Sequence, residues 1–255
     1  MRIIKKEKTR AGENRILLIR KNQDPGAFIQ DKKQLAHAKA RMQVKKDQIL
    51  LNPYDPLEMV LVLDSSDVPK SSRLESARKA AYGTHHVLKD LDLTSVLVQN
   101  GGVEQEECIA VAEGLALTNY QFRKYFTGDS DQAHKLEEIG LVDVELSTRQ
   151  VENLENLVRA VYLTRDLVNE PLSYLTAVQL SAEIELMGKE SGFSVEVFNK
   201  KKIESLKMGG LLAVNKGSVD PPTFSILGWK PENAVNKHPI VLVGKGVVYD
   251  TGGLS

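Results

Sequence analysis

The stretch MVLVLD, residues 59–64, is a short apolar run in which polar residues do not alternate with apolar ones. Such a run predicts a β-strand buried on both faces, as in a parallel sheet. Residues 15–19 (RILLI) and 95–99 (SVLVQ) have the same character. Apolar residues at three- and four-residue spacing predict helices over residues 71–88 and 104–125. This alternation of strands and helices predicts an α/β fold whose sheet is covered by helices.

A second unit is expected beyond residue 144, where the first α/β unit ends. Residues 148–169 carry an apolar stripe that predicts a long helix, and Pro171 stops it because the residue before a proline avoids the α region. Thr176 is the expected N-cap of a helix over residues 177–191, with Gly192 just past its end. The shorter elements expected are strands over residues 193–198, 224–229 and 239–243, a helix over 200–207, and a strand or helix over 211–214.

Composition and charge exclude several classes of protein. The 255 residues are 42% hydrophobic and 27% charged, which is ordinary for a globular chain and argues against disorder. Lys+Arg 34 balance Asp+Glu 34, although residues 1–50 hold 14 basic and 5 acidic residues and residues 101–150 hold 4 basic and 10 acidic ones. Because non-specific nucleic-acid binders are normally basic overall, a nucleic-acid partner is not expected.

Cys108 is the one cysteine in the sequence, which rules out an internal disulfide and a thiolate zinc site. Its place in an apolar helix predicts a core residue. No apolar run reaches a membrane-spanning length, and the charged N-terminus does not resemble a signal peptide. A cytoplasmic protein without a membrane partner is therefore expected. The five histidines show no metal-ligand spacing, so His85 and His86 are expected to be buried or solvated.

The segment IVLVGKGVVYDTGGLS, residues 240–255, carries the clearest chemical signal. A buried strand is expected to run into Lys245, which glycines flank, and Asp250 follows before two more glycines. Sites in open α/β sheets form beyond the carboxyl ends of strands. Residues five apart point to opposite faces of a regular strand, so the chain must bend for Lys245 and Asp250 to meet. The local pattern alone leaves two interpretations open, a functional site and a salt bridge at a turn.

Residues 243–255 (VGKGVVYDTGGLS) resemble the first metal-binding motif of the leucine aminopeptidase family, the dinuclear cytosolic metallopeptidases. Residues 165–176 resemble the entry to that family's catalytic domain, and residues 207–218 with Pro221 and Pro222 resemble its next block. Together these matches cover about residues 156–255, in the family's order. Residues 1 to about 150 match only in kind, since the family's N-terminal domain is a variable α/β module similar to macro domains.

The resemblance implies an α/β chain of three parts. These are an N-terminal macro-like domain over residues 1–147, a connecting helix over 148–170, and the incomplete start of an α/β metallopeptidase catalytic domain over 171–255. The family removes N-terminal amino acids from peptides, leucine among them, by means of a water activated by two metals. Lys245 would bind one metal and Asp250 would bridge both. The cofactors implied are two divalent ions, zinc or manganese, with magnesium also compatible, and the full-length enzyme would be a homo-hexamer.

The sequence also departs from the family's pattern. In the family, the catalytic lysine follows the bridging aspartate by seven residues, and the other acidic ligands and the arginine lie further on. None of these family residues matches a residue among positions 1–255. We therefore expect no catalytic residue in this chain and an incomplete, inactive fragment. Tyr249 stands where many members have phenylalanine, which keeps an aromatic ring.

Two other functions remain open from the sequence. The N-terminal unit could be a non-catalytic binding module for a nucleotide, a nucleic acid or a partner subunit. Its basic first fifty residues, or the turn at Gly101 and Gly102 after a strand, would then form the contact. Alternatively, the segment could mainly support assembly of the oligomer.

Overall fold

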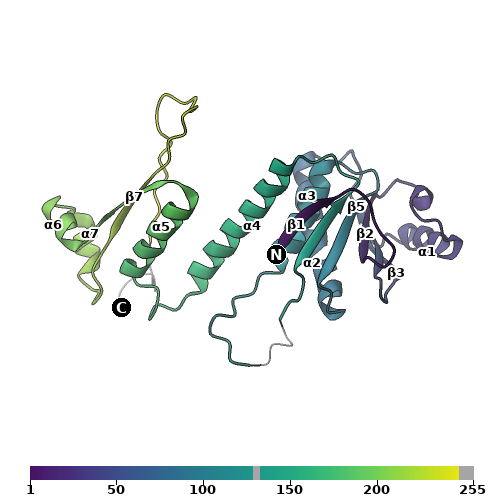
Figure 1. Ribbon diagram of the computed structural model, residues 1–255, viewed down its shortest axis with the longest axis horizontal. Coiled ribbons are helices and arrows are strands. Elements are labelled where there is room, and N and C mark those ends of the chain that lie inside the picture. Colours follow the sequence, from purple (N-terminus) through teal and green to yellow (C-terminus); the bar gives the residue numbers. More distant parts are fainter. Residues whose placement is uncertain (129–132, 247–255) are drawn as a thin grey trace. The chain divides into compact units, whose positions relative to one another are not determined.

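The computed structural model describes residues 1–128 and 133–246 (Figure 1). The chain divides into two compact units, Met1–Arg165 and Asp166–Ser255, and each is described by itself. The division falls near the end of helix α4 (Thr148–Asn169).

The first unit is built on a mixed sheet of six strands in the order β1-β6-β5-β2-β4-β3. Every neighbouring pair is parallel except β3 and β4, which are antiparallel. The predicted α/β class is therefore confirmed. The strands are β1 (Arg2–Lys6), β2 (Arg15–Arg20), β3 (Gln48–Asn52), β4 (Glu58–Leu63), β5 (Ser95–Asn100) and β6 (Glu138–Val142).

Strand β2 shows why its sequence reads as an unbroken apolar run. Ile16 and Leu18 belong to one buried cluster, and Leu17 and Ile19, which point to the opposite face, belong to another. The first cluster packs under α2 (Lys70–Asp90), α3 (Gln105–Thr118) and the start of α4. The second cluster lies under α1 (Lys32–Gln43), beside β3 (Figure 1). A central strand covered on both faces has no polar side to alternate with.

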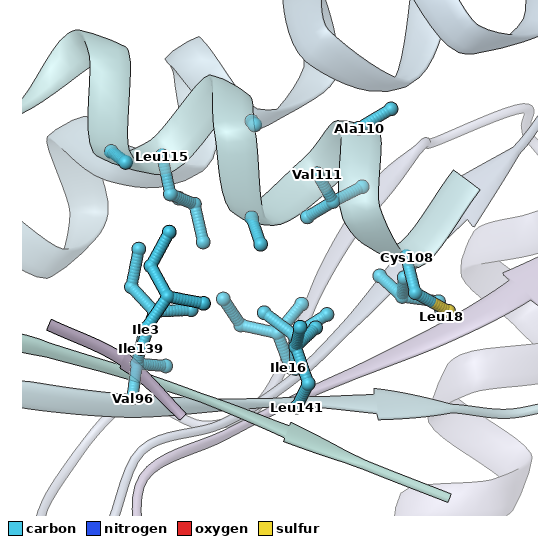
Figure 2. Packing of buried hydrophobic residues seen from close by; sticks show 14 of the residues in the cluster. Ile3, Ile16, Leu18, Val96, Cys108, Ala110, Val111, Leu115, Ile139 and Leu141 are labelled. Carbon is cyan, nitrogen blue, oxygen red and sulfur yellow. The ribbon is translucent and has the colours of Figure 1, made fainter. Parts of the chain in front are cut away.

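The main core lies between α3 and the sheet. Figure 2 shows Val111 and Leu115 of α3 pointing onto Ile16, Ile139 and Leu141 of the strands. Cys108 is fully buried in the same cluster, which confirms its prediction as a core residue. Burial raises the pKa of its thiol to about 12.

The described part of the second unit contains the helices α5 (Ala177–Ser191), α6 (Lys200–Ser205) and α7 (Gly209–Asn215), and a pair of antiparallel strands that α6 and α7 separate in the sequence. These strands are β7 (Ser194–Phe198) and β8 (Phe224–Gly228). Thr176 caps α5 by accepting a hydrogen bond from the Gln179 N–H, and Gly192 ends it with φ 77°. Both terminal signals were predicted from the sequence and are confirmed.

Two predicted elements are wrong. Residues 239–243 form no strand, and the side chains of Ile240 to Val243 are 74–93% exposed. A run of β-branched residues becomes a strand only where another strand accepts its hydrogen bonds, and none of the described strands pairs with it. The helix predicted over residues 104–125 ends earlier, at Thr118. Within the described residues, no helix is both long enough and apolar enough to cross a membrane.

Candidate functional site

Of the two predicted metal ligands, Lys245 falls near the end of the described residues. Lys245 lies in an irregular stretch after β8 and is exposed. This stretch passes close to α5, because a Cβ built on Gly246 would lie 3.4 Å from Leu180 Cδ2. Asp250 lies outside the described residues. Of the predicted pair, the structure therefore places Lys245 alone.

The described residues do not by themselves form a site for the two metal ions that the resemblance implies. Within residues 1–128 and 133–246, no group of three or more His, Cys, Asp or Glu side chains could hold a metal ion. Hard divalent cations are bound mainly by oxygen donors, and a pair of them needs several carboxylates. One exposed lysine falls well short of such a donor set.

The carboxyl ends of β5 and β6 border a cleft in the first unit. Its volume is about 580 Å³, and four carboxylates line it, from Glu104, Glu106, Asp143 and Glu145. This is the edge at which open α/β sheets usually bind ligands. Asp143 and Glu145 were not predicted as site residues, because β6 was not predicted as a strand. The apolar residues of EIGLV (138–142) were the signal that could have found it.

The Gly101-Gly102 turn at this edge has no backbone amides to offer a phosphate. The Gly101 N–H donates to the Leu18 carbonyl oxygen at 2.8 Å. The N–H groups of Gly102 and Val103 both donate to Asn100 Oδ1 at 2.9 Å. Phosphate sites at helix N-termini depend on N–H groups that point at the ligand. The turn is therefore a structural one, and the anionic lining of the cleft would also repel a nucleotide.

A network of buried charges lies beside the cleft and explains how the edge is held. Glu107 is 1% exposed and accepts hydrogen bonds from Arg20 Nη2 at 2.6 Å and from Arg73 Nε at 3.3 Å. Arg73 also donates to the carboxylate of Glu104 and to the carbonyl oxygen of Val68. These bonds join β2, α2 and α3, so the two arginines are occupied inside the fold. Neither arginine is therefore available at this edge to bind a phosphate.

Comparison with known proteins agrees with the sequence motifs. Residues 162–255 match the catalytic domain of the cytosol aminopeptidase family. A probable cytosol aminopeptidase of Chlorobium limicola is 36% identical over 207 residues, which are 73% of this chain and 41% of that protein. Another, from Chloroherpeton thalassium, is 56% identical over 93 residues, which are 36% of this chain and 18% of that protein. The chain thus spans less than half the length of these relatives.

Solved structures show the same fold. A mutant of tomato leucine aminopeptidase has a TM-score of 0.69 at 18% identity, over 89% of this chain and 50% of that one. The bottromycin maturation enzyme BotP, solved in complex with Mn, has a TM-score of 0.66 at 22% identity, over 87% of this chain and 46% of that one. With its three motifs in order and these relatives, the chain belongs to the cytosol aminopeptidase family, the leucine aminopeptidases that its sequence resembles.

Proposed function

We propose that this chain is part of a metalloaminopeptidase that releases N-terminal amino acids, leucine among them, from peptides. The observation that carries the proposal is the motif of residues 243–255, because it lies within the region that matches the family's catalytic domain. The names of the relatives also describe aminopeptidases.

In this proposal, Lys245 and Asp250 are metal ligands, with Lys245 on one ion and Asp250 bridging two. An ammonium group has no free electron pair, so Lys245 has to be unprotonated in that role. The ions are zinc, manganese or magnesium, and the Mn complex of BotP supports a divalent metal of this kind. A pair of such ions, held by these two residues and further ligands, would supply an activated water and polarise the scissile carbonyl. The described residues alone lack the donors for this, so further ligands must complete the site.

The family resemblance also suggests domain boundaries, an oligomeric state and a location in the cell. We propose domain boundaries at residues 1–147 and 171–255, with residues 148–170 as the connecting helix. We also propose that the protein is a homo-hexamer, as the resemblance implies, and that it is cytoplasmic, which the relatives' names support. Sedimentation equilibrium measures the subunit number directly, and a stable monomer of the active enzyme would contradict the hexamer.

The first prediction tests the two ligands. In the longest reading frame that contains these residues, Lys245→Ala and Asp250→Asn should each lower kcat/KM for a leucyl peptide by at least about 100-fold. Even groups that only orient metal ligands are worth roughly 10- to 100-fold. Bound metal per subunit, measured by mass spectrometry, should fall in both variants.

Lys237→Ala is the matched control, because Lys237 is an exposed lysine in the same irregular stretch and lies outside the motif. It should keep both activity and metal. Full activity of Lys245→Ala would show that Lys245 is not a metal ligand. Peptide hydrolysis by residues 1–255 alone would contradict the expectation that they hold no catalytic residue.

A further inference from the structure

Three side chains join α2, the end of α3 and the segment that leads into β6. His85 of α2 has its Nε2 at 3.0 Å from Asn119 Oδ1, and Asn119 is the C-cap of α3. Asn119 Nδ2 donates to the Leu136 carbonyl oxygen at 2.9 Å. His134 Nδ1 lies 3.3 Å from the Asn119 carbonyl oxygen. We call His85, Asn119 and His134 the histidine clasp.

The hydrogen bonds require both imidazoles to present particular protons. Asn119 Nδ2 faces a carbonyl oxygen, so it must be the amide nitrogen, and Oδ1 is left to face His85. His85 therefore carries a proton on Nε2. His134 likewise needs a proton on Nδ1 to donate to the Asn119 carbonyl oxygen. Each histidine makes its contact in the neutral form, so a second proton adds charge without adding a bond to the clasp.

Charge on this pair would be poorly accommodated. The ring centroids of His85 and His134 are 4.8 Å apart, and His85 is only 2% exposed. The groups that act electrostatically on one or both rings are the other imidazoles, including His86, and the ammonium of Lys89. Around them, Lys135 pairs with Asp92, and α4 contributes Tyr162 and Arg165, which donate to carbonyl oxygens near the end of α3. Apart from the imidazoles, the charged group that acts on both rings is therefore the cationic Lys89.

Burial is the largest cause that lowers the pKa of both imidazoles below the ordinary 6.5. The bonds to Asn119 act in the opposite direction, and the neighbouring cationic groups lower the pKa further. A histidine released from the clasp binds its proton more readily than one held in it. The clasp therefore contributes its full stability above about pH 6.5 and loses it as the pH falls.

We propose that the histidine clasp is a pH-sensitive latch, which holds residues 133–136 against α2 and α3 at neutral pH and releases them in mildly acidic solution. The latch belongs to the first unit and does not depend on the proposed peptidase activity. Protonation of either ring places a positive charge beside the other ring and Lys89, and the segment separates so that both imidazoles reach water.

Hydrogen exchange tests the latch on the full chain. After correction for the intrinsic pH dependence of exchange, the amides of residues 133–136 should exchange severalfold faster relative to the core strand β2 at pH 5.5 than at pH 7.5. The double variant His85→Gln with His134→Asn keeps a donor at each position and cannot titrate. Its exchange in this segment should show no such acceleration.

His86→Asn is the matched control, because the exposed His86 contacts the Tyr82 carbonyl oxygen of its own helix and the Tyr82 and His85 rings, and makes no hydrogen bond to Asn119. It should keep the acid response. An NMR titration of the imidazole signals provides a second measurement that needs no variant. The proposal would be overturned if the pKa values of His85 and His134 measured by NMR were 6.5 or higher. It would also be overturned if acid accelerated exchange equally in the wild type and the double variant.

Discussion

Glu107 shows how one residue can serve two structural purposes. As the third residue of α3, it accepts a hydrogen bond from the Glu104 N–H at 2.8 Å and so completes a capping box. The same carboxylate neutralises Arg20 and Arg73 in a nearly dry environment. A buried ion pair is weak support for stability as a whole, but loss of one partner leaves an uncompensated charge.

Glu107→Gln is therefore expected to lower the unfolding free energy of the first unit by about 3–5 kcal/mol. The amide keeps the shape of the side chain but removes the buried anion of Arg20 and Arg73, which are left with only the more exposed Glu104 carboxylate. Urea unfolding followed by far-ultraviolet circular dichroism measures the change. Glu106→Gln is the control on the same helix turn, since Glu106 is 54% exposed and pairs with Lys70, and it should cost no more than about 1 kcal/mol. Equal effects of the two variants would contradict the argument.

At the scale of elements, the contact between α2 and α3 depends on small residues. Ala77 and Ala81 of α2 are fully buried, and Gly114 of α3 faces Ala81 and the backbone of Arg78. A Cβ on Gly114 would lie 2.6 Å from the Arg78 carbonyl oxygen and 2.7 Å from Ala81 Cβ. The two helices approach too closely there for any side chain.

Gly114→Ala should consequently destabilise the first unit by about 1–3 kcal/mol through overpacking. Helix propensity alone predicts the reverse, because alanine is favoured over glycine inside a helix by about 1 kcal/mol. Gly210→Ala in α7 separates the two effects, since no atom outside its own helix turn lies within 4 Å of the added Cβ. That variant should be neutral or slightly stabilising in the same thermal melt. Stabilisation by Gly114→Ala would show that α2 and α3 can move apart.

Elements buried on both faces, or ended by strong local signals, could be predicted from the sequence. Strands β2, β4 and β5 and helix α4 lie at their expected positions to within one residue. Strands β1, β3 and β6 were missed. β1 and β3 are the edge strands of the sheet, whereas β6 lies between β1 and β5. β1 carries Arg2, Lys5 and Lys6. Charged residues on an edge strand interrupt the apolar pattern that predicts a strand, and they also discourage association with other chains.

The end of α3 and the candidate site could not be predicted from local sequence patterns, because both depend on residues that are distant in the sequence. The helix ends at Thr118, and the side chain of its C-cap Asn119 bonds His85 and Leu136, which are distant in the sequence. Lys245 and Asp250 could be proposed only from the family motif, since their spacing does not bring them together. The acidic cleft could not be predicted either, because it forms only when the sheet brings Asp143 and Glu145 next to the start of α3.

At the scale of the whole molecule, buried hydrophobic side chains are distributed very unevenly between the two units. Among the described residues, Leu175 and Ile203 are the only buried hydrophobic side chains outside the first unit. In β8, Phe224, Ile226 and Leu227 are 38–50% exposed. Since burial of apolar area is the main favourable contribution to folding, the two units should differ strongly in stability.

Native-state hydrogen exchange of the 255-residue chain should resolve this difference. Amides of β2 and β5 should exchange only by global opening of the first unit, whereas those of β7 and β8 should exchange through local opening at much lower free energy. Leu18→Ala, which removes a fully buried side chain, should lower protection in the first unit by about 2–5 kcal/mol and leave β7 and β8 unchanged. Equal protection of β7 and β2, or a parallel loss in both units, would mean that the chain unfolds as one cooperative body.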